Sequence, residues 1–428
     1  MAVQGAGAGG TEVQESAVGG SAVGGTALSD TAVGGTAVEG AVDAVNRLTA
    51  RWADSVTGGT VFSVAGVWPL LAFLADGAWG AARAELADAV GMPADQAAAA
   101  ARELLAAMAS MPGLNSALGL WTRRELTVRE EWRAGLPGDT HGVLTEDLPA
   151  SQRALDAWAA ERTGGLIERM PVTLDENVLM VLASALALRT EWPRPFSELR
   201  LSPDAGPWQG RQLTGLRRTG VRLDRVGVTS GPHGYVTELK VPGDNGIDVH
   251  LLLGEQRMTP GQVLGTGVDV LARRLPVVPS GQLPYGDVGP GLRVEQQPCA
   301  TPQPPQLSVT TVAYDMRARH DLLDLHGLFG LTTAMDTGDG HFPGISPSAL
   351  AIGQAEQSTM AQFGALGFRA AAVTAVAPVY GGAQPQLRHT TTVVTARFDR
   401  PFGFLAVHRE SRLILTAGWV TDPTPYGS

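Results

Sequence analysis

The distribution of helix-forming and strand-forming segments constrains the fold of this chain more than any other feature. Apolar residues recur every three or four positions in residues 41–53, and alanines dominate residues 94–108, as in helices. Three runs with strand character, residues 391–398, 402–408 and 412–420, instead lie together near the C-terminus. Because helices and strands do not alternate one by one, we predict an α+β protein with mainly antiparallel sheets.

Other segments add detail to this plan. Residues 180–188 form a nearly continuous apolar run, which is typical of a central strand buried on both faces. Turn-forming residues at Asp76-Gly77-Ala78 divide residues 67–90 into two helices. A Gly/Pro/Gln-rich stretch, residues 276–305, predicts a long surface loop. The remaining predicted elements are helices over 151–170 and 321–327, and strands over 61–63, 115–122, 235–241, 247–253, 307–312 and 349–352.

The first forty residues are of low complexity. The unit Ala-Val-Gly-Gly occurs at residues 17–20, 22–25 and 32–35. Frequent glycines carry a large entropy cost of ordering and bring little apolar surface to offset it. Residues 1–40 are therefore predicted to form a flexible tail.

Charge and composition limit the partners and the location of the protein. The 32 Lys+Arg against 42 Asp+Glu give a formal net charge of −10, which argues against a nucleic-acid partner. The longest apolar stretch, residues 64–75, is too short for a bilayer and contains Pro69, so no membrane span is expected. The N-terminus lacks a signal-peptide pattern, which predicts a cytoplasmic protein. The single cysteine, Cys299, cannot form an internal disulfide and is predicted to be an incidental loop thiol.

Motifs for enzyme chemistry are absent from the sequence. It contains no HExxH, GxSxG or P-loop motif, and no Cys/His set with the spacing of metal ligands. His320 and His326 lie six residues apart, an interval that does not suit one helix face. Ser63 precedes an apolar helix, but the lysine position of an SxxK motif is Gly66. We therefore expect no catalytic residues, no metal and no other cofactor.

Several segments resemble motifs of the serpin (serine protease inhibitor) family and occur in the family's order. Residues 115–121 (NSALGLW) are similar to the family's A-N-x-L-W strand, and residues 398–404 (FDRPFGF) to its F-x-A/N-R-P-F-x-F motif. No single motif is specific, but their shared order over residues 41–423 is difficult to obtain by chance. The other matching segments are residues 61–63 with 74–81, 155–158 with 163–167, 182–188 with Trp192 and Phe196, 342–346, and 418–423.

The resemblance implies a fold and an activity. It implies one serpin domain over residues 41–426, with three β-sheets, surrounding helices and an exposed reactive-centre loop at about residues 365–390. It further implies a monomeric inhibitor of a serine protease that is not itself an enzyme. In the family, the protease cuts the loop, which then inserts as a new strand into the central sheet before the acyl-enzyme is hydrolysed. Heavy use of Arg, Ala, Gly and Val is typical of a GC-rich genome and predicts that this is a bacterial, actinomycete-like member. Because members of the family are often exported, the resemblance also allows an extracellular location.

The resemblance also places the hinge of the loop. Ala370, Ala372 and Thr374 would share the inward face of an inserted strand, which favours small or β-branched residues. Phe368 falls on the same face, where the family prefers Thr or Ser, so it either fills space between the sheet and a helix or slows insertion by overpacking. The hinge comprises Gly367, Phe368, Arg369, Ala370, Ala371, Ala372, Val373 and Thr374.

The bond cleaved by the protease has two possible positions. Counting forward from the hinge places it at about Gly381–Gly382, next to Tyr380, whereas counting back from Phe398 places it near Arg388–His389. Tyr380 would suit a chymotrypsin- or subtilisin-like protease and Arg388 a trypsin-like one, and we favour the region of Tyr380, Gly381 and Gly382.

Positions that control sheet opening in the family also depart from its usual residues. Gly66, Ser184 and Gln357 stand where Ser, Asn and His are usual, and the tryptophan at the end of the sheet is kept as Trp192. Two main functions stay open: an inhibitor, or a non-inhibitory serpin-fold protein that binds a ligand or serves as a protease substrate. The absent enzyme motifs disfavour a third, a hydrolase of unrecognised type.

Overall fold

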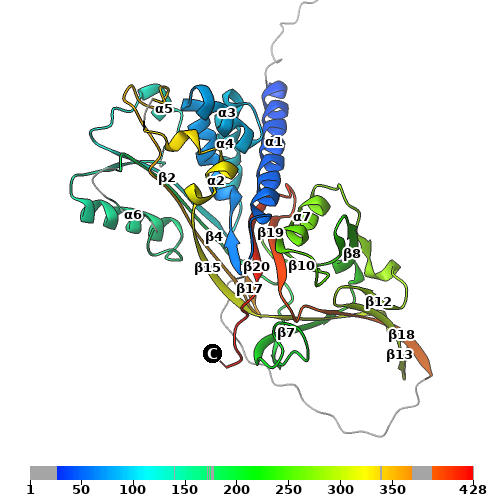
Figure 1. Ribbon diagram of the computed structural model, residues 1–428. Helices are drawn as coiled ribbons and strands as arrows, with labels where there is room; N and C mark the ends of the chain where they lie inside the picture. The colour runs from blue at the N-terminus through cyan, green and yellow to red at the C-terminus, as the bar shows by residue number, and fades with distance from the viewer. Residues whose placement is uncertain are drawn as a thin grey trace, which may run out of the picture.

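The computed structural model describes residues 27–138, 140–170, 172, 174, 178–337, 340–368 and 388–427. They form three β-sheets with helices packed against them (Figure 1). None of the helices in these ranges is long and apolar enough to cross a membrane.

The first sheet, called here the central sheet, contains the apolar run that the sequence predicts as a buried strand. That strand is β4 (Met180–Leu188), which is buried at every position. It pairs antiparallel with β2 (Leu114–Arg123) and parallel with β16 (Gln354–Phe363). The other strands of this sheet are β3 (His141–Leu144), β5 (Thr190–Glu191), β15 (Tyr314–Asp321) and β17 (Gly367–Phe368).

The second sheet contains the two last strands of the chain. β19 (Phe402–His408) and β20 (Ile414–Val420) pair antiparallel and lie between β1 and β10, where almost all of their residues are buried. The strand order is β1-β20-β19-β10-β9-β8-β11. The remaining bounds are β1 (Thr60–Phe62), β8 (Val226–Gly231), β9 (Gly234–Pro242), β10 (Ile247–Gly254) and β11 (Val278–Pro279).

The third sheet extends to the opposite end of the molecule from α6 (Figure 1). Its strand order is β12-β13-β18-β14-β7-β6, and within it only the pair β14 and β18 is parallel among the described strands. The bounds are β6 (Ser197–Leu201), β7 (Leu213–Gly220), β12 (Gly286–Gly289), β13 (Leu292–Cys299), β14 (Gln306–Val312) and β18 (His389–Arg397).

Helices cover both faces of the central sheet. α2 (Val64–Gly77) lies on the inner face and is buried along nearly its whole length. α6 (Leu148–Arg162) lies on the outer face, where Leu155 and Ala159 belong to the same apolar cluster as Ala183 and Ala185 of β4. The other helices are α1 (Ala27–Ala53), α3 (Gly80–Val90), α4 (Ala94–Ala109), α5 (Glu130–Ala134), α7 (Pro260–Leu271) and α8 (His326–Phe329).

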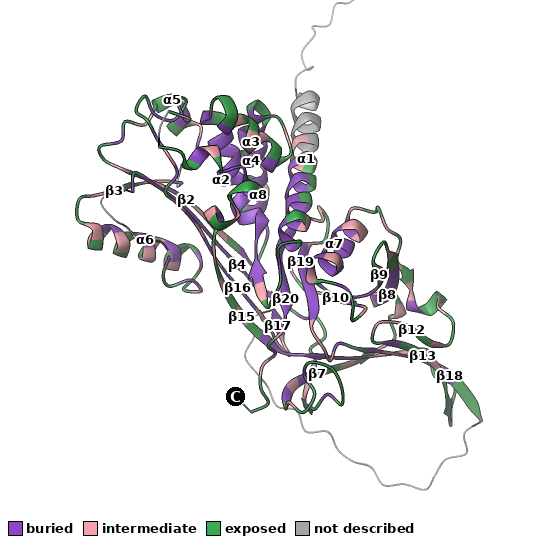
Figure 2. Ribbon diagram, viewed as in Figure 1, coloured by how far each residue is buried: buried purple, intermediate pink, exposed green. Residues whose placement is uncertain are grey.

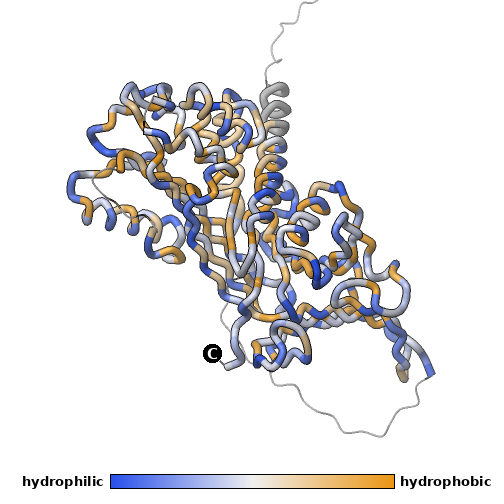
Figure 3. Tube along the Cα trace, viewed as in Figure 1, coloured by the Kyte–Doolittle hydropathy of each residue, from blue (hydrophilic) through white to orange (hydrophobic). Residues whose placement is uncertain are grey.

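One large apolar core joins the inner face of the central sheet to α2 and the second sheet, and a smaller one lies under α6. Figure 2 shows buried residues along α2, the central strands and the inward side of α1, with exposed residues on the outer side of α6. Hydrophobic residues follow the same distribution (Figure 3). The two faces of β4 thus belong to different cores, so any separation of β4 from β16 disturbs both.

The prediction of a loop over residues 276–305 is wrong. This stretch contains β11, β12 and β13, and β13 pairs with β18 along its whole length. Cys299 is accordingly the last residue of a strand and is buried, not a loop thiol. Gly, Pro and Gln have low strand propensity, but pairing with a distant strand overrides that local preference.

Four other boundaries differ from the sequence prediction. Helix α1 begins at Ala27, not near residue 41, because turns added to a packed helix need no new nucleation. The helix predicted over 151–170 ends at Arg162, before Gly164 and Gly165, which both have positive φ. Residues 349–352 form no strand, since β16 begins at Gln354. Residues 321–327 are split between the end of β15, a 3-10 turn η3 (Leu322–Leu325) and the start of α8.

Candidate functional site

The central sheet is open at one end, between β4 and β16. These two strands pair from Gln354↔Val181 to Thr359↔Leu186 and then separate. β17 lies between them there, antiparallel to β16 at Phe363 and antiparallel to β5, which follows β4. β15 already occupies the other edge of β16, so β17 is on the β4 side. The opening therefore already holds a short strand of two residues.

Gly367 fits this opening because it has no side chain. It lies opposite Glu191 of β5 and directly against the backbone of that strand. A Cβ atom added to Gly367 would lie less than 3.0 Å from the carbonyl oxygen of Thr190, a distance that real Cβ atoms essentially never show. The close approach of the two backbones thus requires glycine here.

Phe368 points from β17 into the core between the central and second sheets. It is 1% exposed, and its ring centroid lies 6.1 Å from that of Phe404 on β19. Tyr314 stacks between the rings of Phe404 and Phe363, at 5.2 Å and 5.4 Å, and so completes an aromatic cluster. Phe368 therefore fills space between two sheets in the intact protein, and its two predicted roles in an inserted strand stay predictions.

A tight turn before β17 is tied to the segment that follows β4. The amide of Gly364 donates to the carbonyl of Gly367 (2.9 Å), which closes the turn. The indole Nε1 of Trp192 donates to the carbonyl of Gly364 (3.0 Å), and its backbone amide donates to Leu366 (2.9 Å). The ring of Trp192 also lies 5.1 Å from that of Phe363. Trp192 therefore holds the turn from which β17 starts.

The closed part of the β4–β16 pair lies over the N-terminus of α2. Gln357 Nε2 donates to the carbonyl of Ser63 (2.7 Å), and the amide of Ser63 donates to Gln357 Oε1 (2.9 Å). Ser63 Oγ accepts from the amide of Gly66 (3.2 Å) and donates to the carbonyl of Leu415 (2.6 Å). One serine thus links the helix cap, β16 and the second sheet.

Ser184 lies opposite Gln357 in the register and faces Gly66. A Cβ atom on Gly66 would lie 2.6 Å from Ser184 Oγ, so the missing side chain makes room for this hydroxyl. Ser184 is fully buried, and its Oγ has no hydrogen-bond partner among the described residues. A buried hydroxyl without a partner costs stability, so the closed pair carries a penalty at this position.

The carboxyl group of Glu356 adds electrostatic strain at the closed end. Glu356 lies opposite Ala183 of β4 and opposite Asp321 of β15. Burial and the nearby charge of Asp321 raise the pKa of Glu356 to about 7, although Arg319 lowers it and Asp324 raises it further. At neutral pH the carboxyl group is therefore only partly ionised, and its charge is unfavourable in the closed sheet.

Comparison with known proteins identifies this architecture. A family model described as serpin (serine protease inhibitor) matches residues 41–205. Serpin-Z6C of Oryza sativa subsp. japonica is 24% identical over 392 residues, which cover 86% of this chain and 91% of the rice protein. The structure of thyroxine-binding globulin in complex with thyroxine superposes with a TM-score of 0.68 at 16% identity, covering 90% of this chain and 99% of that one. The protein has the serpin fold. The mouse protein-Z dependent protease inhibitor is similar too, with a TM-score of 0.67 at 13% identity over 92% of this chain and 98% of that chain.

The serpin fold confirms the predicted α+β class and its three sheets with surrounding helices. The family model and the rice relative support membership of the serpin family. The family is described as one of serine protease inhibitors. The predicted bacterial, actinomycete-like origin stays a prediction.

The structure brings together three of the four residues predicted to control sheet opening. Gly66, Ser184 and Gln357 meet at the closed part of the β4–β16 pair, whereas Trp192 lies at the open end beside β17. Ser63, which the sequence offered only as an unsupported nucleophile, is hydrogen-bonded to two of these, Gln357 and Gly66. The polar residue before an apolar helix was a signal for a helix cap that could have identified it.

The two described ends of the loop predicted at about residues 365–390 differ in exposure. Ala365 and Phe368 are 3% and 1% exposed, because the turn and β17 are already packed into the sheet. At the other end, Arg388 is exposed, and His389 is exposed but is the first residue of β18. Nine predicted hinge and cleavage-site residues fall outside the described residues: Arg369, Ala370, Ala371, Ala372, Val373, Thr374, Tyr380, Gly381 and Gly382.

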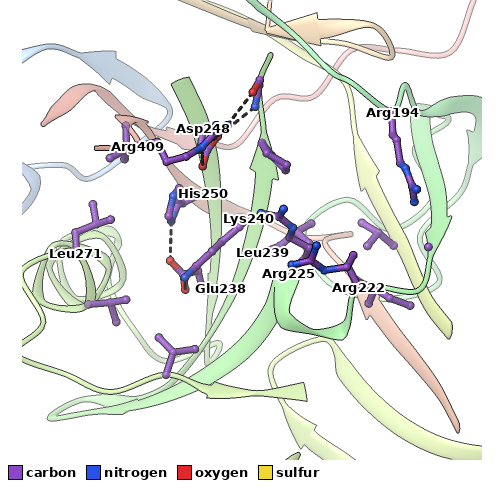
Figure 4. A pocket seen from close by; sticks show the side chains of 18 of the residues that line it. Arg194, Arg222, Arg225, Glu238, Leu239, Lys240, Asp248, His250, Leu271 and Arg409 are labelled. Carbon is purple, nitrogen blue, oxygen red and sulfur yellow. Dashed lines mark hydrogen bonds and ion pairs between the residues drawn. The ribbon is translucent and has the colours of Figure 1, made fainter. Parts of the chain in front are cut away.

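A cavity of about 1170 Å³ lies between the second and third sheets and the C-terminal end of α7 (Figure 4). Arg194, Arg222 and Arg225 line the side away from Leu271 of α7. In its wall, Glu238 accepts from His250 Nδ1 (2.7 Å), and Lys240 Nζ lies 3.4 Å from the same carboxylate. Apolar side chains of β14 and α7 also contribute, so the cavity combines positive charge with apolar surface.

Proposed function

We propose that this protein inhibits a serine protease by suicide cleavage, in which the cut segment after β17 inserts as a strand between β4 and β16. The observation that carries the proposal is β17 itself, which is antiparallel to both of its neighbours at the open end. Extending β17 would replace the parallel β4–β16 ladder by two antiparallel ladders, which are slightly more stable per residue.

The chemistry of trapping belongs to the protease. Its serine Oγ attacks the carbonyl carbon of the cleaved bond, the C–N bond breaks, and the protease histidine gives a proton to the leaving amine. The segment of this chain ending at that carbonyl is then held as an ester and is free to insert. Insertion carries the protease along the sheet before water can hydrolyse the ester.

The position of His389 favours the upstream cleavage site. His389 pairs with Cys299 in β13, so a cut between Arg388 and His389 would require a protease to bind residues already held in a ladder. We therefore infer cleavage in the region of Tyr380, Gly381 and Gly382, by a chymotrypsin- or subtilisin-like protease.

The test is incubation with chymotrypsin, subtilisin and trypsin, followed by denaturing electrophoresis and mass spectrometry of the new ends. We expect a covalent complex with one of the first two proteases, and a cleaved form that melts at a higher temperature than the intact protein. Plain cleavage with an unchanged Tm would overturn the proposal.

A matched pair of hinge variants makes this test specific. At a period of two, Thr374 shares the inward face of the inserted strand with Phe368, and Ala371 faces outward. Thr374→Arg should therefore still be cleaved but form no complex, because insertion would bury an unpaired charge. Ala371→Arg should form complexes as the parent does.

A second candidate function, a carrier that does not inhibit, is favoured by the cavity. Burial and the charges of Arg225 and Arg194 lower the pKa of Arg218 to about 10, which indicates positive charge not fully neutralised there. An anionic molecule with an apolar body would fit, and one protein of this fold was solved with thyroxine bound. Calorimetry with thyroxine and with an anilinonaphthalene sulfonate dye tests this, and no heat at micromolar concentrations would exclude it for these ligands.

We further infer a monomer that acts in the cytoplasm or outside the cell. Size-exclusion chromatography with light scattering, and fractionation of the source cells, test these two expectations.

A further inference from the structure

β18, the strand that follows residues 369–388, lies inside the third sheet and not at its edge. On one side it pairs with β13 from Leu292↔Ala396 to Cys299↔His389. On the other side it pairs parallel with β14 over a shorter stretch, from Gln306↔Val393 to Thr310↔Arg397. Without the hairpin of β12 and β13, β18 would be an edge strand held by one parallel ladder.

The β12–β13 hairpin is fixed to β18 by packing as well as by its ladder. Leu292 and Val294 are each 2% exposed, and their partners Ala396 and Val394 are fully buried. The turn of the hairpin also reaches the end of β18, where the carbonyl of Gly291 accepts from the amide of Arg397 (2.8 Å). These contacts make β18 costly to remove.

Removal of β18 matters because the uncut chain is too short to insert fully while β18 stays in place. An added strand in register with β16 would keep Phe368 opposite Phe363. Its residue 377 would then lie opposite Gln354, the first residue of β16. Its end would then lie about 30 Å from the level of Phe368, at ~3.3 Å per residue. Residues 378–388 span at most roughly 38 Å when fully extended, so little length remains to cross to His389 in another sheet.

We propose that the β12–β13 hairpin is a clamp on β18 that restricts strand insertion to the cleaved chain. This inference rests on the proposed insertion of the segment after β17. A cut upstream of His389 frees the inserting segment from β18 altogether, so the clamp does not oppose insertion in the inhibitory reaction. It opposes only the spontaneous insertion of the intact chain, which would consume the inhibitor without a protease.

Cys299 offers a built-in probe of the clamp. It is the single cysteine of the chain, is 7% exposed, and lies opposite His389 at the start of β18. Separation of β13 from β18 exposes its thiol, so the rate of its reaction with a thiol reagent reports that separation.

The experiment weakens the clamp without cutting the chain. In the full-length protein, Leu292→Ala/Val294→Ala removes apolar contacts to β18, whereas Arg293→Ala changes the exposed face of the same strand and serves as the control. During incubation below the Tm we follow Cys299 labelling, intact mass, Tm and remaining capacity to form a protease complex. We expect the double variant to label and to convert to an uncut, more heat-resistant and inactive form at least about tenfold faster than the parent or the control.

A cross-strand disulfide tests the inference in the opposite direction. Gln296→Cys/Thr392→Cys, in a Cys299→Ser background, joins directly opposed residues of β13 and β18. The oxidised form should convert more slowly than its reduced form yet still trap protease after cleavage.

The clamp and the insertion mechanism would be contradicted by different results. If cleavage still raises the Tm but weakening and cross-linking leave conversion of the intact chain unchanged, the clamp is wrong and the insertion mechanism stands. If cleavage gives no rise in Tm, the insertion mechanism fails, and the clamp fails with it.

Discussion

The open and closed ends of the β4–β16 pair differ in how well their groups are satisfied. At the open end, β17 is hydrogen-bonded on both sides, Phe368 packs in an aromatic cluster, and Trp192 holds the preceding turn. Among the described residues, Ser184 Oγ and Thr359 Oγ1 at the closed end are buried without hydrogen-bond partners, whereas at the open end the hydroxyl of Tyr314 is one such group. An inserted strand would thus start from a well-packed end and extend into a poorly satisfied one. For the proposed insertion, this difference would supply a direction and part of the driving force.

The largest effect is expected from removing the aromatic anchor at the open end. Phe368→Ala deletes a fully buried ring, which should destabilise the intact protein by about 3–4 kcal/mol. Phe368→Leu keeps most of the apolar volume and serves as the control, with a smaller loss. Thermal unfolding of both variants checks this. Equal losses would show that the ring makes no specific contribution to the open end.

A slightly smaller effect is expected from crowding the same end. Gly367→Ala places a Cβ against the carbonyl of Thr190 and should cost about 2 kcal/mol, together with a loss of protease complexes, because β17 is displaced. Gly353→Ala, just before β16, meets no atom within 4 Å and is the matched control. Calorimetry and complex formation measure both. A variant at Gly367 that behaves like the control would contradict the assigned position of β17.

At the closed end, the expected effect falls on the link between β16 and α2. Gln357→Leu removes both hydrogen bonds to the Ser63 backbone and should destabilise the intact protein by about 1–3 kcal/mol, with faster spontaneous conversion. Gln362→Leu lies on the partly exposed face of the same strand and should change little.

Ser184→Ala, at the same end, removes the unpaired hydroxyl and should be neutral or slightly stabilising. If Ser184→Ala destabilises as much as Gln357→Leu, the closed end is not strained as described.

The smallest effect is a pH dependence due to Glu356. Its folded pKa of about 7 lies above the ordinary 4.5, so its stabilising contribution is complete below about pH 4.5 and is lost as the pH rises through 7. Because the side chain is about half exposed, solvent screening reduces the effect to roughly 1 kcal/mol. Urea unfolding of the parent and of Glu356→Gln between pH 5 and 8 measures it. The parent should gain more stability than the variant on acidification, and parallel curves would exclude Glu356 as the source.

Local patterns in the sequence were enough to locate most elements. The apolar run of β4 follows from composition alone, since every position of a strand buried on both faces must be apolar or small. The hairpin of β19 and β20 follows from two β-patterned runs separated by a short turn. Ser184 and Gln357 were singled out by resemblance to a family, not by their own pattern. The buried face of β16 carries Gln357 and Thr359, so its alternation of polar and apolar residues is weak, and the sequence did not predict this strand.

What the sequence by itself determined is therefore the order of helices and strands and the identity of the most buried strand, because periodicity and apolar content are local properties. Only the tertiary structure decided which strands are neighbours. It inserted Gly367 and Phe368 between β5 and β16, and it converted a Pro/Gln-rich stretch into a hairpin that holds β18. Both results depend on hydrogen bonds between segments that are far apart in the chain. Because the stability of a strand depends on the partner strand it packs against, a local sequence pattern cannot predict it.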